Sequence, residues 1–502
     1  MKILVLNCGS SSIKYQLFNI ETKEVLAKGG IEKIGLEDSF LKFNLPNGEK
    51  ETIKTAIPEH TTGVRLIIDV LTSEKYGVVK SISEIDAVGH RMVHGGEKFS
   101  ASTLLTDEVL RDFVACNDLA PLHNPANMKG VDAVKAIAPE MPQVGVFDTA
   151  FHQTMPDYAY LYAIPYSLYE KYGVRRYGFH GTSHRYVSSK ICEYLGIKAE
   201  GSKIITCHIG NGGSITAVKD GKSIDTTMGL TPLDGIMMGT RSGNIDAGAV
   251  TFIMEKEGLT PTGVSNLLNK QSGLLGISGV SSDMREVSAA VADGNKRAEL
   301  AKQMYSYSIK KYIGAYAAAM GGVDVVIFTG GVGENRHEIR ESVCEGLEFL
   351  GINIDKKINA EVMFGKDGII STKESKVKVV VLPTDEELMI ATVTHPSQDG
   401  VGIAGPQVGL KRRVVAVQRF DKEGEPFEVY PNIRITWASD SLEAGPEGCL
   451  SVPDRRGDVK RSQEIVIEYA DMAALKAGKT SDGIPMRKET IKDFTAVIFQ
   501  HE

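Results

Sequence analysis

The fold is decided by residues 3–18, which read ILVLNCGSSSIKYQLF. An apolar strand leads into a small polar turn, and the second half alternates between apolar and polar residues as a half-buried strand does. The pattern returns about 200 residues later, a spacing far beyond that of solenoid repeats, in IITCHIGNGGSITAV at residues 204–218. Both copies predict a hairpin, so we expect an α/β chain with two duplicated lobes.

A third glycine-rich segment supports this organisation. Residues 330–335, GGVGEN, follow an apolar strand at 325–329 and precede helical periodicity through Ile339, Val343 and Leu347. Glycine turns let backbone N–H groups approach phosphate oxygens without side-chain obstruction. Ordinary tight turns are the alternative, but three such turns within a duplication favour a nucleotide-phosphate site. No GxxxxGK[ST] motif occurs, so the chain is not a P-loop protein.

Other patterns place further elements. A long amphipathic helix is predicted at residues 298–320 and a buried strand at 377–382. A Pro/Ser/Gln/Asp/Gly stretch at 396–400 marks a domain boundary. Residues 400–405 match GxGxxG, but no clean strand precedes them, so we do not expect a dinucleotide site there.

Composition restricts the class of protein. The 502 residues suit two to four domains at roughly 100–200 residues each. A net charge of −7 argues against a general nucleic-acid binder, and no run approaches the roughly 20 apolar residues of a membrane helix. The N-terminus turns polar too early for a signal peptide. Six scattered cysteines without a CxxC pair suit reduced thiols in a cytoplasm.

Two arginines lie between small residues, Arg91 in GHRMVHGG (89–96) and Arg241 in GTRSG (239–243). Such an arginine presents its planar fork to a phosphate or a carboxylate, although either one alone is more often a surface ion pair. The two arginines are therefore candidate anion ligands.

Two other polar residues, Asp148 and His180, lie in predicted loops after apolar strands, where functional residues concentrate. His90 and His94 have the i,i+4 spacing of metal ligands, but the glycines beside them disfavour a helix. We expect no metal role for these two histidines.

Taken together, the motifs of the first part of the chain resemble acetate kinases over residues 1 to about 391. The matching stretches are NCGSSSIK (7–14), GHRMVHGG (89–96), APLHNP (120–125), FDTAFH (147–152), YGFHGTSH (177–184), HIGNG (208–212), GTRSG (239–243), GGVGEN (330–335) and PTDEEL (383–388). The resemblance implies the actin-like, duplicated two-lobe α/β fold (ASKHA). Lobe I is expected at residues 1–149 and about 383–393, and lobe II, which binds the nucleotide, at 150–382. The family makes acetyl phosphate and ADP from acetate and ATP, reversibly, with magnesium or manganese.

The resemblance also implies roles for individual residues. Magnesium would be held by Asn7 and Glu386, and Arg91 would bind the acyl substrate. The catalytic residues would be Asp148, His180, Arg241 and His123. The nucleotide would contact Lys14, His208, Ile209, Gly210, Asn211, Gly212, Asp283, Met284, Arg285, Gly331, Val332, Gly333, Glu334 and Asn335.

The chemistry agrees with these residue types. In-line phosphoryl transfer spreads negative charge over the equatorial oxygens, so cationic donors and magnesium carry most of the catalysis. Acetate needs no deprotonation at pH 7, because its pKa is near that of Asp or Glu. We therefore expect Asp148 to position the substrate or a cationic partner and not to act as a base.

The last hundred or so residues, from about 394 to 502, resemble peptide deformylases through GVGIAGPQ (400–407), EGCLS (447–451) and QHE (500–502). In that family a Cys and two His bind iron or zinc, a Glu is the general acid/base and a Gln serves the oxyanion site. Gln407, Cys449, His501 and Glu502 occupy four of these positions. Gly405 replaces a usual alanine, the second histidine is missing, and the kinase tail stands in place of the usual N-terminal helix. We expect an incomplete α+β segment that binds iron or zinc poorly and is inactive.

The sequence thus predicts an acetate kinase with a C-terminal deformylase-like segment. The alternatives are a bifunctional kinase and deformylase, a kinase for propionate or another short-chain carboxylate, and a non-catalytic actin-like assembly protein. The expected partners are the small molecules acetate and ATP, with no nucleic acid and no membrane. A cytoplasmic homodimer that associates through the second lobe is expected.

Overall fold

The structure is a computed structural model, and it describes residues 1–45, 48–121, 123–394, 402–404, 414–419, 422, 427–431, 433–449, 452–470 and 486–501. For some residues of the later segments only the backbone is described. The chain divides into two compact units, Met1–Thr394 and His395–Glu502. In the described part of the chain, no helix combines the length and apolar character needed to cross a bilayer.

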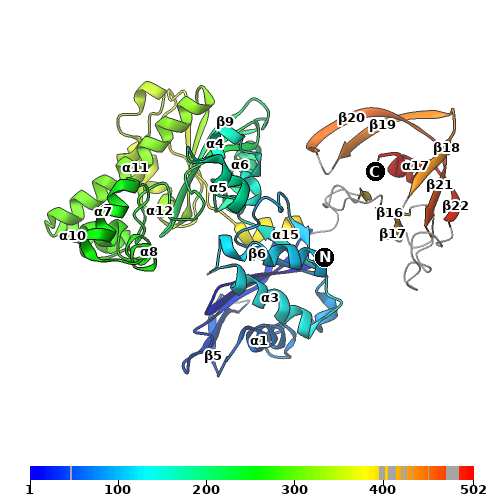
Figure 1. Cartoon of the computed structure of the whole chain (residues 1–502), viewed down its shortest axis with the longest axis horizontal. Helices are drawn as coiled ribbons and strands as arrows, with labels where there is room; N and C mark the ends of the chain where they lie inside the picture. The colour runs from blue at the N-terminus through cyan, green and yellow to red at the C-terminus, as the bar shows by residue number, and fades with distance from the viewer. Residues whose placement is uncertain are drawn as a thin grey trace. The chain divides into compact units, whose positions relative to one another are not determined.

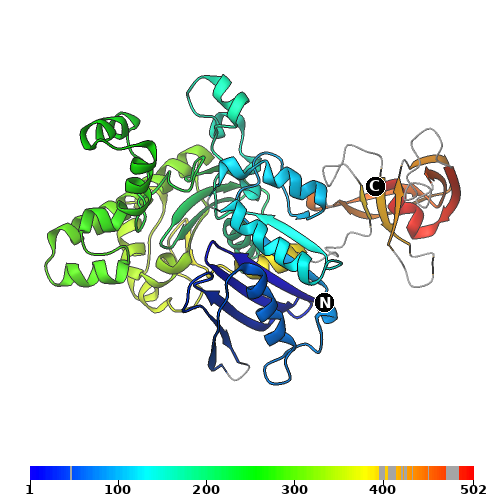
Figure 2. The ribbon, with the colours of Figure 1, turned by 60° about the horizontal axis from the view of Figure 1, so that its bottom comes forward.

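The first unit contains two sheets, and we call the parts built on them lobe I and lobe II. In Figures 1 and 2 lobe I is coloured mainly blue to cyan and lobe II mainly green to yellow; the two lie apart in the view of Figure 1 and overlap in that of Figure 2. The yellow helix α15 (Glu386–Thr394) returns to lobe I after the chain has completed lobe II (Figure 1).

Lobe I has an eight-stranded sheet in the order β5-β4-β3-β2-β1-β6-β8-β7. Its strands are β1 (Lys2–Cys8), β2 (Ser12–Asn19), β3 (Glu24–Glu32), β4 (Phe40–Asn44), β5 (Lys50–Lys54), β6 (Ala87–Met92), β7 (Thr103–Leu104) and β8 (Gln143–Phe147). Its other α-helices are α1 (His60–Thr72), α2 (Asp107–Val114) and α3 (Asn124–Ile137). Successive side chains of β1 point to opposite faces of the sheet, so this strand contributes to two separate cores. Leu4 and Leu6 join the core beneath α1 and α3, whereas Ile3 and Val5 join the core with α15.

Lobe II has a six-stranded sheet in the order β11-β10-β9-β12-β14-β13. Its strands are β9 (Lys203–Ile209), β10 (Gly213–Lys219), β11 (Lys222–Thr226), β12 (Val325–Thr329), β13 (Gly368–Ile369) and β14 (Lys378–Val381). Its α-helices are α4 (Asp157–Tyr160), α5 (Tyr166–Tyr172), α6 (Gly181–Leu195), α7 (Ala247–Glu257), α8 (Pro261–Lys270), α9 (Gly273–Ser278), α10 (Met284–Ala292), α11 (Lys296–Met320), α12 (Gly330–Asn335), α13 (His337–Cys344) and α14 (Lys356–Glu361). Alternation again sets the layers: Ile205 packs with α11 and Ile204 with α6.

The duplication predicted from the two hairpins is confirmed by strand order and direction. β3-β2-β1-β6-β8 of lobe I corresponds to β11-β10-β9-β12-β14 of lobe II. In both series an antiparallel hairpin, β1–β2 or β9–β10, is followed by two parallel neighbours. The two lobes therefore present their hairpin turns in equivalent positions.

Two details differ from the prediction. Residues 330–335, expected as a loop before a helix, are themselves the short helix α12. Thr329 is extended and Gly330 has φ +77°, so one glycine makes the turn and the others continue as helix. Leu347 lies beyond the end of α13 and joins the core from the segment that follows. His90 lies in strand β6, and its Nε2 donates a hydrogen bond to Oε1 of Gln143 at 2.7 Å, as in a packed core histidine.

The second unit is mostly β-structure with one described α-helix, α17 (Asp493–His501). Its described strands are β15 (Gly402–Ala404), β16 (Val414–Gln418), β17 (Phe427–Pro431), β18 (Arg434–Ala438), β19 (Leu442–Cys449), β20 (Val452–Ser462), β21 (Glu464–Ala470) and β22 (Met486–Lys492). They form the sheets β15-β16-β17 and β18-β21-β22 and the hairpin β19–β20. Ala496 and Phe499 of α17 pack into a small core with Ile465 and Ile467 of β21. The predicted boundary stretch, residues 396–400, lies outside the described residues.

Candidate active site

The lobe I side of the site centres on an arginine and an aspartate. Arg91 lies near the end of β6, and Asp148 follows the adjacent parallel strand β8. Nε of Arg91 donates to Oδ1 of Asp148 at 3.1 Å, and Nη2 donates to Oδ2 at 2.7 Å. Asp148 is 1% exposed, and its charge raises the pKa of Arg91. This bidentate pair fixes the guanidinium plane and leaves the Nη1 edge for another ligand.

A carboxylate without a partner lies beside this pair. Oε1 of Glu386, at the start of α15, is buried and has no hydrogen-bond partner among the described residues. Burial raises the pKa of Glu386; the charge of Asp148 raises it further, while Arg91 and Lys14 act in the opposite direction. Asn7 faces Lys14 across the β1–β2 hairpin. A buried carboxylate oxygen without a partner suits a hard divalent cation, and the amide of Asn7 supplies the same kind of oxygen ligand, so the residues present fit magnesium.

The lobe II side contributes a group of histidines. His180 is the N-cap of α6 and has φ +56°, an unusual conformation for a residue with a side chain. Its ring stacks on that of His208, with centroids 4.3 Å apart. Nδ1 of His208 is 2.7 Å from Oγ of Ser183, which is itself 2.8 Å from Oγ1 of Thr384.

The backbone of the two lobes meets at His180. Gly181 N–H donates to the carbonyl oxygen of Asp148 at 2.9 Å. A Cβ atom on Gly181 would lie 2.2 Å from that oxygen, so only glycine permits this approach. His180 is therefore held next to the Arg91–Asp148 pair.

Arg241 approaches from the loop after β11. Nη1 of Arg241 donates to the carbonyl oxygen of Pro232 at 3.3 Å, and a Cβ atom on Gly212 would lie 3.1 Å from that Nη1. Among the residues that the structure describes, no carboxylate pairs with Arg241. Burial lowers its pKa. Its positive charge is thus available to an anion in the site.

Electrostatic interactions show that these groups converge. Partial burial and the charges of Arg241 and Arg91 lower the pKa of His123, which precedes α3. Burial and the charge of Arg91 hold the pKa of His208 at about 4, against the effect of Asp148. The residues predicted as catalytic are thus brought together from both lobes.

A cavity of about 530 Å³ in lobe II adjoins this centre. It contains most of the predicted nucleotide contacts: Gly210, Asn211, Asp283, Met284, Arg285, Gly331, Val332 and Asn335. It is also lined by five residues that the sequence did not indicate: Leu274, Ser282, Tyr305, Arg336 and Phe364. Asp283 caps α10 and pairs with Arg285, which lowers the pKa of Asp283 to about 2. Ile209, Gly212, Gly333 and Glu334 lie in the segments on either side of these lining residues.

Two arginines that the sequence did not indicate, one buried and one half-buried, support the site. Arg340 of α13 is 0% exposed, and it donates to the carbonyl oxygens of Gly333 and Glu334 in α12 and of Asn359 and Val362. It therefore ties the nucleotide-lining helix to the segment that carries Phe364. Its one sequence signal is its position on the same helix face as buried residues of α13.

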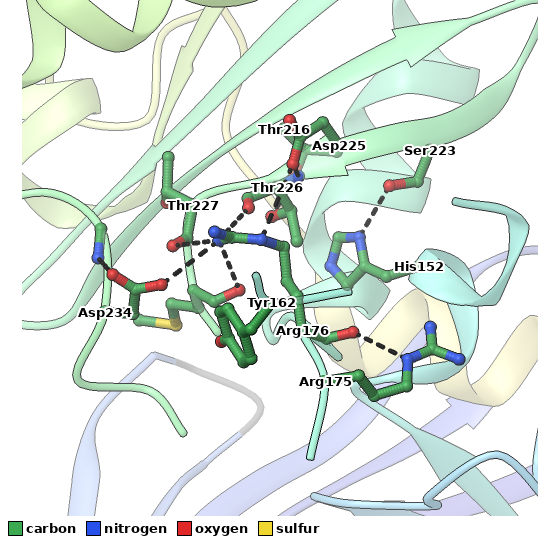
Figure 3. Close-up of polar contacts among 12 residues, drawn as sticks. His152, Tyr162, Arg175, Arg176, Thr216, Ser223, Asp225, Thr226, Thr227 and Asp234 are labelled. Carbon is green, nitrogen blue, oxygen red and sulfur yellow. Dashed lines mark hydrogen bonds and ion pairs between the residues drawn. The ribbon is translucent and has the colours of Figure 1, made fainter. Parts of the chain in front are cut away.

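The second, Arg176, joins the segments that lead to His180 and Arg241 (Figure 3). It donates to the carbonyl oxygens of Thr226 and Thr227 at 2.7 and 2.9 Å, and it pairs with Asp234 at 3.4 Å. The two loops that carry catalytic candidates thus share one anchor.

The deformylase-like candidates are less fully described. Gln407 and Glu502 lie outside the described residues, while Cys449 ends β19 and His501 ends α17. Over the residues that are described, no group of three or more His, Cys, Asp or Glu side chains could hold a metal. The poor binding of iron or zinc stays a prediction.

The duplicated sheets, the glycine-lined cavity and the facing arginines define a two-lobed phosphotransferase of the actin-like class. Comparison with known proteins gives the family. Residues 2–392 match the acetokinase family, and the chain belongs to it. An acetate kinase of Bacteroides thetaiotaomicron is 73% identical over 394 residues, which is 78% of this chain and 98% of that protein. One of Phocaeicola vulgatus is 72% identical over the same share.

Solved structures agree. The crystal structure of Porphyromonas gingivalis acetate kinase is 60% identical, with a TM-score of 0.76, and the match covers 78% of this chain and 98% of that one. A propionate kinase from Francisella tularensis is 44% identical, with a TM-score of 0.73 and the same coverage. The predicted phosphotransferase class and the two-lobe fold are therefore confirmed. The family acts on acetate and ATP with a divalent metal.

Residues 383–502 match the polypeptide deformylase family, so the predicted second resemblance is confirmed. The two family matches overlap at residues 383–392. In the structure these residues belong to the first unit, where Ile390 and Ala391 of α15 pack into the core of lobe I.

Proposed function

We propose that the chain transfers the γ-phosphoryl group of ATP to acetate, reversibly, at the junction of its two lobes. The observation that carries this proposal is the convergence of the Arg91–Asp148 pair from lobe I with His180 and Arg241 from lobe II. One arginine is held for a carboxylate, and the other is left with a free charge for a phosphoryl group. Facing cations on the two reactants are what a transfer between two anions requires.

Arg91 receives the carboxylate of acetate. Asp148 occupies the edge of the guanidinium that Nε and Nη2 form, so acetate binds the remaining donors. Both oxygens of Asp148 accept from Arg91, and acetate is already an anion at pH 7. Asp148 therefore orients the arginine and removes no proton.

His180, Arg241 and His123 stabilise the transferring phosphoryl group. Its equatorial oxygens gain negative charge in the transition state, and preorganised donors act most strongly where water is excluded. Arg241 supplies a full charge, while burial keeps the pKa of His180 well below its ordinary value. His180 therefore donates from an uncharged ring.

The nucleotide occupies the lobe II cavity. The cavity is lined by Gly210 and Asn211, by Gly331, Val332 and Asn335, and by Asp283–Arg285, and the two glycine-containing segments receive the phosphates. Lys14 and His208 extend this set toward the lobe I hairpin. Asn7 and Glu386 hold magnesium, which neutralises phosphate charge when it is bound.

The acceptor is acetate, with propionate as the runner-up because a solved relative is a propionate kinase. A turnover assay with acetate, propionate and butyrate tests the assignment. We expect the highest kcat/KM with acetate. A rate of ADP formation that no carboxylate increases would contradict the proposed function.

We propose further that the protein is a cytoplasmic homodimer that associates through lobe II. Leu300, Met304 and Tyr307 form an exposed apolar row along one face of α11, with Tyr307 62% exposed. Light scattering tests the mass. The double variant Met304→Asp/Tyr307→Asp should give a monomer, whereas a wild-type monomer would contradict the assignment.

The deformylase match favours a second candidate activity, hydrolysis of a formyl group from formyl-methionyl peptides. Inactivity of this unit stays our prediction. A deformylation assay with added iron or zinc, run beside the kinase assay, decides between the two.

A further inference from the structure

A path of uncharged side chains leads from the interior of lobe II to His180. Nδ1 of His180 is 2.9 Å from Oγ of Ser214. The same Oγ is 2.7 Å from Nε2 of His184, and Nδ1 of His184 is 2.6 Å from Oγ1 of Thr206. Thr206, His184, Ser214 and His180 therefore form one continuous hydrogen-bonded path.

The packing of lobe II builds this path. Thr206 lies in β9 and Ser214 in the antiparallel neighbour β10. His184 lies one helical turn after His180, so α6 presents both rings to the sheet. Thr206, His184 and Ser214 are all 0% exposed. Water has no access to the interior of the path, so its members can satisfy their polar atoms only with one another or with the backbone.

Proton counting restricts the path to two arrangements when both rings are neutral. The Ser214 hydroxyl has one proton, and the two rings are its only hydrogen-bond partners among the described residues, so it donates to one ring and accepts from the other. In the outward arrangement Thr206 donates to His184, His184 donates to Ser214, and Ser214 donates to Nδ1 of His180. The His180 proton is then on Nε2. In the reverse arrangement the proton is on Nδ1, and Nε2 is a bare acceptor.

The rings are neutral near pH 7. Burial lowers the pKa of both His180 and His184 well below the ordinary value, and neighbouring histidines lower it further. Each ring therefore has one donor and one acceptor nitrogen. The direction of the path decides which of these His180 presents from Nε2.

Nε2 of His180 lies on the reaction side of the ring. A Cβ atom on Gly212 would be 3.9 Å from this nitrogen and 3.1 Å from Nη1 of Arg241. Nε2 is thus close to the guanidinium that faces the phosphoryl group. A bare acceptor here would direct a lone pair at an anion, whereas an N–H would stabilise it.

We propose that Ser214 and His184 are positioning residues that hold His180 as its Nε2–H tautomer when a phosphoryl anion is bound. The inference rests on the proposed phosphoryl transfer and names how that site is oriented. The anion selects the outward arrangement, and the path transmits no net charge. His180 then donates as a neutral ring, with its tautomer set by residues that do not contact the substrate.

Ser214→Ala breaks the path next to His180, and Ser223→Ala is the matched control. Ser223 is also 0% exposed, and its Oγ is 2.9 Å from Nδ1 of His152, a histidine outside the path (Figure 3). Ser214→Ala removes two buried hydroxyl–imidazole hydrogen bonds from lobe II, and Ser223→Ala removes one. We expect Ser214→Ala to lower kcat about tenfold to hundredfold, as loss of an orienting partner typically does. KM for both substrates should change less than about twofold in either variant, and Ser223→Ala should keep kcat within about twofold.

The tautomer itself is read by ¹⁵N NMR of histidine-labelled protein with ADP, magnesium, acetate and aluminium fluoride as the planar phosphoryl mimic. The His180 signals are assigned by their absence in His180→Asn. Wild type and Ser223→Ala should show His180 protonated on Nε2 alone, and Ser214→Ala should show both tautomers. Thr206→Val breaks the far end of the path and should shift kcat and the tautomer in the same direction by less, which keeps the test valid if Ser214→Ala does not fold.

An Nδ1–H tautomer in the wild-type complex would overturn the proposal. So would an unchanged tautomer and an unchanged kcat in Ser214→Ala. If wild type phosphorylates no carboxylate, the proposed function fails, yet the tautomer in the complex with ADP and aluminium fluoride still decides whether the path orients His180.

Discussion

The two lobes share one sheet topology but hold their arginines in opposite ways. Arg91 of lobe I is locked by two hydrogen bonds to the buried Asp148. Arg241 of lobe II is held by the carbonyl oxygen of Pro232, and no carboxylate of the described residues pairs with it. The difference separates two tasks. A paired arginine has a fixed plane and a reduced net charge, which suits orientation of a planar carboxylate. An unpaired one keeps its full charge for the transition state.

The largest expected effect comes from removing the unpaired charge. Arg241→Ala should lower kcat by about 10³–10⁵, the range for a transition-state arginine in phosphoryl transfer. Its Tm should stay close to that of wild type, because no buried partner is left behind. Steady-state kinetics and thermal unfolding on the same sample test both parts. A loss of kcat below about tenfold would show that Arg241 does not supply the charge that stabilises the transition state.

Arg91→Ala should lose activity and also stability. It leaves Asp148 buried without its partner, and breaking a buried pair costs about 3–5 kcal/mol. We expect Tm to fall by several degrees, and Arg91→Ala/Asp148→Asn to recover most of that loss without recovering activity. Equal Tm values for Arg91→Ala and Arg241→Ala would contradict the difference between a paired arginine in lobe I and an unpaired arginine in lobe II.

Asp148→Asn alone should lower kcat/KM for acetate about hundredfold, by loosening Arg91, while KM for ATP changes little. The amide keeps one acceptor for the guanidinium, so the fold should survive. A true base would show itself by loss of an ionisation from the pH profile of kcat/KM. We expect the pH profile of kcat/KM to have the same shape in Asp148→Asn and in wild type.

Most of the proposed nucleotide contacts lie in lobe II, and Arg340→Met tests this assignment. Losing the anchor of α12 should weaken ADP binding about tenfold or more, since its carbonyl partners remain buried. Acetate binding at Arg91 should be unaffected. Calorimetric titration with ADP, beside Lys296→Met as a control at an exposed position of α11, measures the change. Wild-type ADP affinity in Arg340→Met would show that α12 needs no such support.

The smallest expected effect is a pH dependence of stability that arises from a buried histidine in each lobe. Burial holds the pKa of His90 in lobe I and of His152 in lobe II at about 4, against an ordinary value of 6.5. The unfolded chain therefore binds more protons between these values, so stability is fully present above about pH 6.5 and is lost as the pH falls toward 4. Thermal unfolding from pH 7 to 5 should show a falling Tm. His90→Gln, which cannot titrate, should make the decline shallower; a steeper one would contradict the cause.

The hairpins were predictable because their signal is local. Residues 3–18 and 204–218 alternate apolar and polar side chains around small turns, and short-range alternation is enough to define paired strands. The catalytic candidates followed from family motifs at the ends of those strands. Arg340 and Arg176 could not be found in this way. Each binds carbonyl oxygens distant in sequence, and a single arginine on a helix or loop otherwise indicates a solvated surface.

The helix α15 shows a second reason why part of the structure could not be predicted from the sequence. Its residues match two families, and the sequence alone does not say which core they join. Ile390 and Ala391 fit between β1, β6 and β8 of lobe I, so packing over the whole unit decides the matter.

Formation of acetyl phosphate tests the central claim most directly. The 502-residue protein is incubated with ATP, magnesium and isotopically labelled acetate, and the product is trapped with hydroxylamine as the hydroxamate. We predict labelled hydroxamate and ADP in equal amounts, with neither formed above background by Arg241→Ala. ADP released at the same rate without acetate, or no hydroxamate with it, would contradict the account.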